Sequence, residues 1–144
     1  MEDLERFVAA QDELGTYGRA LAELRRGNKT GHWMWFIFPQ IAGLGLSAMS
    51  QRYAIATLAE ARAYLAHPVL GPRLRECATV LADTRGLSAE QILGGIDALK
   101  LRSSMTLFLR ADPQETVFQR VLDAYYGGVP DSATDRLLTP PTPA

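Results

Sequence analysis

Side chains capable of chemistry are concentrated in one ten-residue run, GHWMWFIFPQ, which covers residues 31–40. Both tryptophans of the protein and one of its two histidines, His32, lie within it. Each aromatic side chain covers about 150–250 Å² of apolar surface when it is buried. The His32 imidazole, the two indole N–H groups and the Gln40 amide each need a hydrogen-bond partner once they leave water. Because apolar packing alone does not call for these polar groups, the run predicts one wall of a ligand pocket.

Each polar or aromatic member of the run has a chemical role open to it. The flat indole rings could stack on a base or another planar group. A histidine side chain can gain or lose a proton near neutral pH, so His32 could act as an acid or a base, donate a hydrogen bond to a ligand, or bond a backbone carbonyl in the core. Gln11 interrupts an apolar helix face and could bond the loop backbone or a ligand. The expected site residues here are His32 as the catalytic group and, as ligand-binding groups, Trp33, Trp35, Gln40 and Gln11.

A second polar group, KLRSSMT, begins at Lys100 in a segment that is otherwise apolar. Lys100, Ser103 and Ser104 share one helix face because they are three and four residues apart, and Arg102 lies on a neighbouring row. A helix that is apolar nearly all round is normally buried, so these cations and hydroxyls need partners. They suit a phosphate or carboxylate, and we expect all four to bind the ligand. The alternative is an internal ion pair of Arg102 and close helix contacts at the serines.

Composition and charge exclude several classes of function. The 144 residues are 47% apolar and 22% charged, as in an ordinary globular domain, and the net charge is −1. No non-specific binding to nucleic acid or to an anionic membrane is therefore expected. The single cysteine, Cys77, excludes an internal disulfide and a multi-cysteine metal site, and we expect no metal and no cofactor. Without an apolar run near 18 residues or a secretory signal, a cytoplasmic protein is predicted, of undetermined oligomeric state.

The remaining pattern is helical. Apolar residues at three- and four-residue spacing predict a first amphipathic helix over roughly residues 2–26, with Gly27 at its stop. Ser88 and Gln91 have the spacing of a capping box at the start of a short helix. The further helices are predicted over residues 50–66, 68–83, 88–93, 97–111 and 113–126.

Glycines and Pro39 interrupt residues 28–47, which we therefore expect to form one long aromatic-rich loop. A short strand over residues 33–38 is the alternative, although the sequence offers no obvious second strand to pair with it.

The expected fold class is thus all-α, a single compact helical domain over residues 1–128. A Pro-rich C-terminal tail is expected over residues 129–144. Within that tail only Leu137 and Leu138 have the apolar side chains needed to dock on the domain.

Several motifs resemble a known family. The run GHWMWFIFPQ with the following GLG, then YAI, EARAYLAHPVLGPRL and DALKLRSSMTLF, is similar to the bacterial family called domain of unknown function 1810. The similarity extends over nearly the whole chain, from Phe7 to Gly128, with the motifs in the same order. The resemblance implies a mainly helical fold. It implies little about function, because that family has no established activity.

The residues themselves predict a protein that binds a small anionic ligand, such as a nucleotide or a phosphorylated nucleoside or sugar derivative. The aromatic run would stack on a base, the row that begins at Lys100 would hold phosphate, and His32 would transfer a proton. Hydrolysis of a phosphoester or an N-glycosidic bond is the first reaction class to test, although the residues leave open whether the protein is an enzyme. The alternative is a non-enzymatic protein-interaction module in which Trp33 and Trp35 form an exposed patch.

Overall fold

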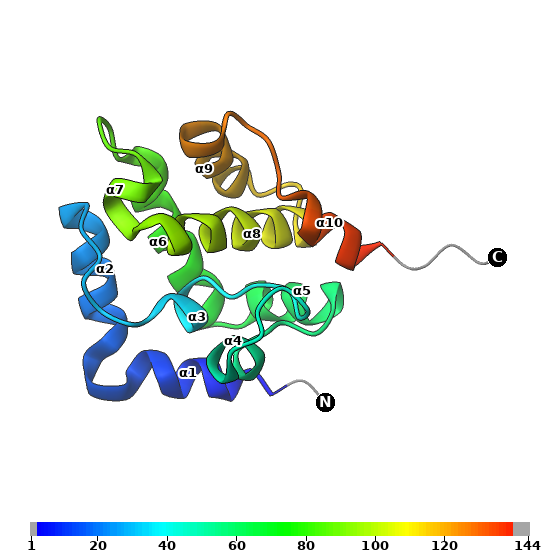
Figure 1. The fold of residues 1–144 in the computed structure, drawn as a ribbon. Coiled ribbons are helices and arrows are strands. Elements are labelled where there is room, and N and C mark those ends of the chain that lie inside the picture. Colours follow the sequence, from blue (N-terminus) through cyan, green and yellow to red (C-terminus); the bar gives the residue numbers. More distant parts are fainter. Residues whose placement is uncertain (1–2, 140–144) are drawn as a thin grey trace.

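The chain folds into a stack of short and medium helices, described over residues 3–139 in a computed structural model (Figure 1). The all-α prediction is confirmed, since this part of the chain holds helices and one isolated bridge, Ile41 to Ile55, but no strand. The helices are α1 Glu5–Asp12, η1 Glu13–Gly15, α2 Thr16–Arg26, α3 Met34–Ile37, α4 Ala48–Arg52, α5 Leu58–Ala66, α6 Leu70–Asp83, α7 Ala89–Leu93, α8 Gly95–Ala111, α9 Thr116–Tyr126 and α10 Ser132–Leu138.

Helix α8 is the centre of the fold and runs through the middle of the molecule in Figure 1. It packs against α5, α7, α9 and α10, while α6 packs on α5 and α9 from the other side. Leu101, Met105 and Phe108 of α8 are completely buried. The prediction that this apolar helix is buried is therefore confirmed for the part from Leu101 to Leu109, whereas Ile96 and Leu99 near its start are exposed, which corrects the prediction there. The buried polar residues of α8 must find partners inside the molecule.

The predicted helix over residues 2–26 is broken into α1, η1 and α2, which corrects the prediction of one continuous helix. Leu14 and Gly15 both adopt left-handed backbone conformations, with φ of 52° and 69°. Gly15 adopts this conformation without strain because it lacks a Cβ atom. The Leu14 side chain is 82% exposed although the apolar pattern placed it on the core face. The kink turns α2 back onto α6, so that the two halves of the predicted helix form two sides of a hollow.

The aromatic segment between α2 and α4 contains the short helix α3 rather than a strand over residues 33–38. The N–H of Ile37 donates to the Trp33 carbonyl at 3.1 Å, which closes the helical turn. After α3 the chain is extended, and the Ile55 N–H donates to the Gln40 carbonyl at 2.8 Å. The predicted aromatic loop is therefore present, with one helical turn inside it.

The predicted helix over residues 50–66 is also divided, into α4 and α5. Between them the chain is extended at Ile55, which is completely buried beside Ile41. Thr57 then caps α5, because its hydroxyl accepts the Glu60 N–H at 3.0 Å. The Ser88–Gln91 capping box at the start of α7 is found as predicted.

Part of the expected C-terminal tail is an ordered helix. Asp131 caps α10 through its carboxylate, which accepts the Thr134 N–H at 3.0 Å, and Thr134 is completely buried. Of the two leucines predicted to dock, Leu138 packs against the core, whereas Leu137 is 46% exposed. Residues 140–144, which hold most of the tail's prolines, lie outside the described part of the chain.

None of the helices within residues 3–139 combines the length and apolar character that a bilayer crossing requires.

Replacing Leu14 by glycine should raise the free energy of unfolding by about 0.5–1 kcal/mol. The left-handed conformation costs an L-residue about 1–2 kcal/mol, and the added backbone freedom of glycine in the unfolded chain offsets part of the gain. Urea denaturation measures the change. The matched control is Leu46→Gly, because Leu46 is similarly exposed, at 86%, but its backbone φ is not positive. That control should lose stability, and a loss of stability in Leu14→Gly would contradict the assignment of strain to Leu14.

Candidate functional site

Residues 29–45 border three neighbouring hollows that share residues with one another. His32 lines the first two, and Trp35 lines the second and third. The Glu23 hollow, of about 430 Å³, is lined by Ala10, Glu13, Leu14, Thr16, Arg19, Glu23, Gly31, His32, Trp33, Phe36, Met49, Arg52 and Tyr53. The Asp97 hollow, of about 350 Å³, is lined by Lys29, His32, Met34, Trp35, Leu93, Gly94, Gly95, Ile96 and Asp97. The Gln40 cavity, of about 120 Å³, is lined by Trp35, Gln40, Ile41, Ala42, Gly43, Gly45, Ser50, Gln51, Tyr53 and Ala54.

Glu23 of α2 is a buried carboxylate in the first of these hollows. Only 7% of the residue is exposed. One oxygen, Oε1, accepts the backbone N–H groups of Thr30 and Gly31 at 2.7 and 2.8 Å, and the indole N–H of Trp33 at 3.0 Å. Because all three bonds end on Oε1, the second oxygen keeps its capacity to accept from a ligand.

These hydrogen bonds keep Glu23 ionised. Burial by itself would raise the pKa of the carboxyl group, because it disfavours the charged form. The bonds from Gly31, Thr30 and Trp33 outweigh burial, and the pKa lies below its ordinary value of 4.5. The Glu23 hollow therefore contains a fixed negative charge at neutral pH.

The rim of the Glu23 hollow is rich in polar and charged groups. The exposed side chains of Arg19 and Arg52 come from α2 and α4, and His32 comes from the loop between α2 and α3. Glu13 adds a second carboxylate from η1. The buried Glu23 carboxylate, the exposed Glu13 carboxylate, two guanidinium groups and an imidazole thus line one space, which offers a polar ligand groups of both charges.

Two lysines share the carboxylate that lines the Asp97 hollow. Lys29 Nζ lies 2.9 Å from one oxygen of Asp97, and Lys100 Nζ lies 3.8 Å from the other. Lys100 also lies 5.2 Å from the centroid of the Trp35 ring, a cation–π distance. Lys29 and Asp97 line the hollow itself, so their charges balance there. Of the predicted site residues, Trp35 and His32 line this hollow, and Lys100 lies against the Trp35 ring.

Gln11 and Trp33 are held inside the protein. The Gln11 amide donates to the Phe36 carbonyl at 2.8 Å and to the Tyr64 hydroxyl at 3.2 Å, and its oxygen accepts from Arg73. The alternative in which Gln11 bonds the loop backbone is therefore the arrangement observed. Trp33 is 2% exposed, and its indole N–H is committed to Glu23. Its ring is a wall of the hollow and offers no exposed stacking face.

Two members of the predicted phosphate row on α8 bond another part of the molecule, and a third is buried. The Arg102 guanidinium donates to the Val129 carbonyl at 2.9 Å, and the Ser103 hydroxyl bonds Asp131 at 3.1 Å. These bonds join α8 to the segment before α10. Ser104 is completely buried, and its hydroxyl has no hydrogen-bond partner among the described residues. The row is therefore divided, because Lys100 contacts Asp97 and Trp35 whereas Arg102 and Ser103 bond the C-terminal segment.

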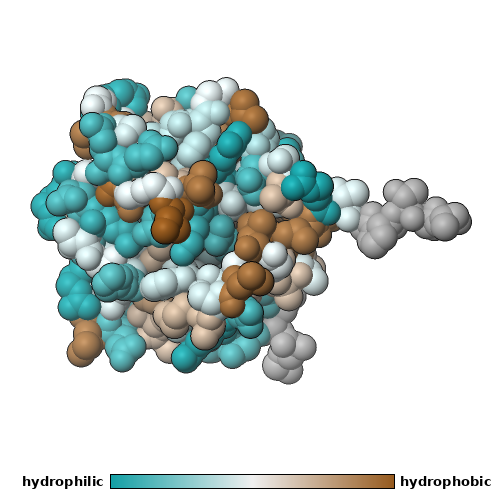
Figure 2. All heavy atoms as spheres, viewed as in Figure 1, coloured by the Kyte–Doolittle hydropathy of each residue, from teal (hydrophilic) through white to brown (hydrophobic). Residues whose placement is uncertain are grey.

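Several apolar side chains are exposed, and two of them border the hollows: Ile96 lines the Asp97 hollow with Trp35, and Leu14 lines the Glu23 hollow with Trp33. The most exposed ones on α8 are Ile96 and Leu99, at 74% and 67%. Figure 2 shows apolar side chains over the region where α8 and α10 lie, on a surface that is otherwise mostly hydrophilic. A surface patch made by Trp33, which the alternative hypothesis requires, is not present because that residue is buried.

Sequence reasoning missed Glu23, Arg19 and Arg52 as candidate site residues. A signal existed for Glu23, which occupies an apolar helix face together with Ala20 and Leu24, both completely buried. A carboxylate at such a position needs dedicated partners. The two arginines carry no comparable signal, because exposed arginines are common and only the kinked fold brings α2 and α4 to the same hollow.

Comparisons with known proteins agree with the motif resemblance. A family model described as "Protein of unknown function (DUF1810)" matches residues 1–138. The chain is similar to the crystal structure of the conserved hypothetical protein Rv1873 from Mycobacterium tuberculosis, with 51% sequence identity and a TM-score of 0.91. That match covers 94% of this chain and 96% of the other. None of the curated proteins with which the chain was compared matches it.

Replacing Glu23 by glutamine should lower the free energy of unfolding by about 1.5–3 kcal/mol at neutral pH, the range for hydrogen bonds to charged groups. Because the folded-state pKa is below the ordinary 4.5, the carboxylate stabilises the fold above that pH and loses this effect as the pH falls through the folded pKa. The difference between the wild type and Glu23→Gln should therefore shrink in acid.

Urea denaturation between pH 7 and pH 3 measures this difference. The matched control is Glu90→Gln, on the exposed face of α7, which should change stability by less than about 0.5 kcal/mol. A difference between wild type and Glu23→Gln that stays constant over this pH range would mean that the Glu23 charge does not hold the loop.

Proposed function

We propose that this chain, which belongs to the DUF1810 family of proteins of unknown function, binds a small phosphorylated nucleoside derivative in the Glu23 hollow and hydrolyses its N-glycosidic bond. The observation that carries the proposal is the buried, ionised carboxylate of Glu23, which shares this hollow with His32, Arg19 and Arg52. The ligand is anionic, as expected from the sequence. Its phosphate binds the two arginines of the rim, and not the polar residues of α8 that the sequence suggested.

Arg19 and Arg52 are suited to hold the phosphate. Neither guanidinium belongs to an ion pair among the described residues. Arg19 donates to the Thr16 hydroxyl at 3.3 Å, and the Arg52 guanidinium lies 5.4 Å from the centroid of the Tyr53 ring. A guanidinium group without a carboxylate partner can form two parallel hydrogen bonds to a phosphate. A phosphate on the rim would direct the rest of the ligand toward Glu23.

The charge of Glu23 favours one of the two reactions considered from the sequence. Cleavage of a glycosidic bond develops positive, oxocarbenium-like charge on the sugar ring. A fixed carboxylate stabilises that charge and needs no reorganisation to do so. Phosphoester hydrolysis instead concentrates negative charge on the phosphoryl oxygens, which the same carboxylate would oppose. The N-glycosidic bond is therefore the better match.

His32 is assigned the proton transfer. Its exposed side chain reaches the Glu23 hollow from the loop before α3. A protonated imidazole can give its proton to the departing ring nitrogen while water adds to the anomeric carbon, and the proton that this water releases restores the imidazolium. The products are the free base and the sugar phosphate. Glu23 is a weak base because its pKa is lowered, and it acts through its charge.

Ribose 5-phosphate should raise the melting temperature of the wild-type protein, and the double variant Arg19→Ala/Arg52→Ala should lose that shift. At about one hundred times the Kd, a ligand adds about 2.7 kcal/mol to the free energy of unfolding. Differential scanning fluorimetry measures the shift. The matched control is Arg102→Ala, which removes a guanidinium bonded to the Val129 carbonyl and should keep the shift. A shift lost in the control and kept in the double variant would place the phosphate on α8.

Incubation with purine and pyrimidine nucleoside 5′-monophosphates should release free base, which liquid chromatography detects. His32→Ala should lower kcat by roughly 10²–10⁴ and Glu23→Gln by roughly 10²–10³, each corrected for the folded fraction. The control His67→Asn changes the other histidine, whose ring accepts the Val69 N–H at 3.1 Å, and should keep the rate. If kcat corrected for the folded fraction is unchanged in His32→Ala, His32 takes no part in the mechanism. If no nucleoside monophosphate releases free base, the proposed hydrolase activity is wrong.

A further inference from the structure

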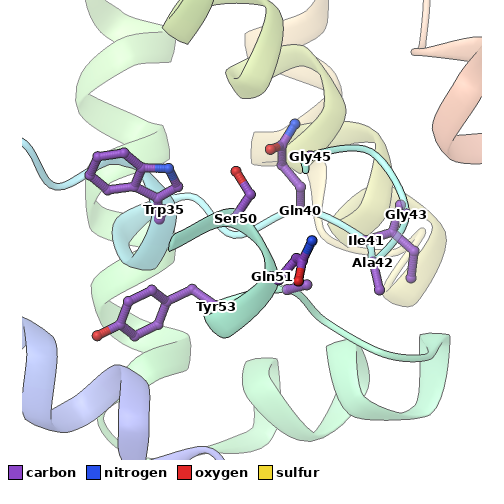
Figure 3. Close-up of a pocket in the computed structure, with 10 residues that line it drawn as sticks. Trp35, Gln40, Ile41, Ala42, Gly43, Gly45, Ser50, Gln51 and Tyr53 are labelled. Carbon is purple, nitrogen blue, oxygen red and sulfur yellow. The ribbon is translucent and has the colours of Figure 1, made fainter. Parts of the chain in front are cut away.

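The Gln40 cavity has a lining of a different kind from the Glu23 hollow. It lies between α3, α4 and the loop of residues 40–45, and none of the residues that line it is charged (Figure 3). Its volume of about 120 Å³ is several times what one water molecule occupies. This lining favours an uncharged ligand group, since a charge placed there would have no side chain of opposite charge beside it.

Hydrogen-bond donors in this cavity lack partners. The indole Nε1 of Trp35 is buried and has no partner among the described residues. In Figure 3 the nitrogen edge of this indole faces Ser50 and Gln40, whose side chains come from α4 and from the loop. The Ser50 hydroxyl accepts from Ser47 at 2.9 Å, so its own proton remains available. The Gln40 amide adds a donor and an acceptor.

The walls of the cavity are held by backbone hydrogen bonds. The Ile55 N–H donates to the Gln40 carbonyl and the Ala42 N–H donates to the Ile55 carbonyl, each at 2.8 Å. The Gln51 amide donates to the Leu46 carbonyl at 3.0 Å, which ties the loop to α4. At Gly45 a Cβ atom would lie 2.4 Å from the Ser50 Cβ, so glycine is needed for the loop to approach α4 this closely. The cavity is therefore a defined space whose shape is set by the fold.

We propose that the Gln40 cavity is a binding site for an uncharged planar group in which a carbonyl stands next to an N–H, as in a cyclic amide. The carbonyl oxygen accepts from the Ser50 hydroxyl and from the Trp35 indole, which turns slightly into the cavity to reach it. The adjacent N–H donates to the Gln40 amide oxygen. This pairing satisfies the buried N–H of Trp35, whose lack of a partner otherwise costs stability.

The size of the cavity limits the group to one ring. An engineered apolar cavity of about 150 Å³ in another protein holds benzene, so 120 Å³ with an open side accepts a single five- or six-membered ring. A fused bicyclic ring would have to project from the opening. The site requires neither Glu23 nor His32, and it can be tested independently of the proposed hydrolysis.

The test is a titration with 2-pyridone, a cyclic amide of one ring, followed through the indole N–H signals in ¹H–¹⁵N spectra. The chain has two tryptophans and hence two such signals. The chemical shift of the Trp35 indole signal should change as 2-pyridone is added and reach a plateau at saturation. The chemical shift of the Trp33 signal should not change, because its N–H is bonded to Glu23 at 3.0 Å. The Trp35→Phe variant, which retains one indole signal, assigns the two.

Two variants test the individual hydrogen bonds. Trp35→Phe and Gln40→Leu should each weaken the binding of 2-pyridone about fivefold, the loss expected for one net hydrogen bond of about 1 kcal/mol. The Trp35 signal remains available in Gln40→Leu, and binding to Trp35→Phe is followed through the signals of 2-pyridone itself. The matched control Gln114→Leu changes an exposed glutamine before α9 and should leave the affinity unchanged.

Three outcomes would overturn the proposal. A Trp35 signal that does not move at millimolar 2-pyridone would mean that the cavity holds water only. Benzene binding as tightly as 2-pyridone would show an apolar cavity without the proposed hydrogen bonds. An unchanged affinity in both Trp35→Phe and Gln40→Leu would place the 2-pyridone elsewhere.

Discussion

The candidate site depends on one carboxylate oxygen. Glu23 Oε1 accepts hydrogen bonds from Thr30, Gly31 and Trp33, and these bonds hold an irregular stretch of backbone against α2. An irregular segment has no helical or sheet partners of its own for its N–H groups, so a buried carboxylate supplies them. If this anchor were absent, His32 would lose its position between the Glu23 and Asp97 hollows, and the Trp33 ring would no longer form a wall.

A second anchor lies at the other end of the same segment. The Gln11 amide bonds the Phe36 carbonyl and the Tyr64 hydroxyl inside the core. Glu23 and Gln11 belong to α2 and α1, which the left-handed residues Leu14 and Gly15 set at an angle. The kink therefore allows two polar side chains to hold one aromatic segment from both ends. The hollows on either side of this segment follow from that arrangement.

The polar residues of α8 show how a buried helix can satisfy such groups internally. Arg102 and Ser103 bond Val129 and Asp131 and so join the C-terminal segment to the central helix. Lys100 is directed to Asp97 and Trp35 on another side. The cations and hydroxyls in this row of α8 thus contact two separate regions of the protein. The residues and their spacing look the same whether the partner is an anionic ligand or the protein's own chain.

The helical class, the burial of the later part of α8 and the capping box at Ser88 could be predicted from the amino-acid sequence, because periodicity and capping are local properties. Where the helices break and which distant residues meet depends on tertiary packing. The kink at Leu14 and the presence of Arg19 and Arg52 around one hollow did not follow from these local patterns. A pattern of apolar residues reports which face of a helix is buried, whereas a site depends on the angles between helices, and those are set by the packing of the whole chain.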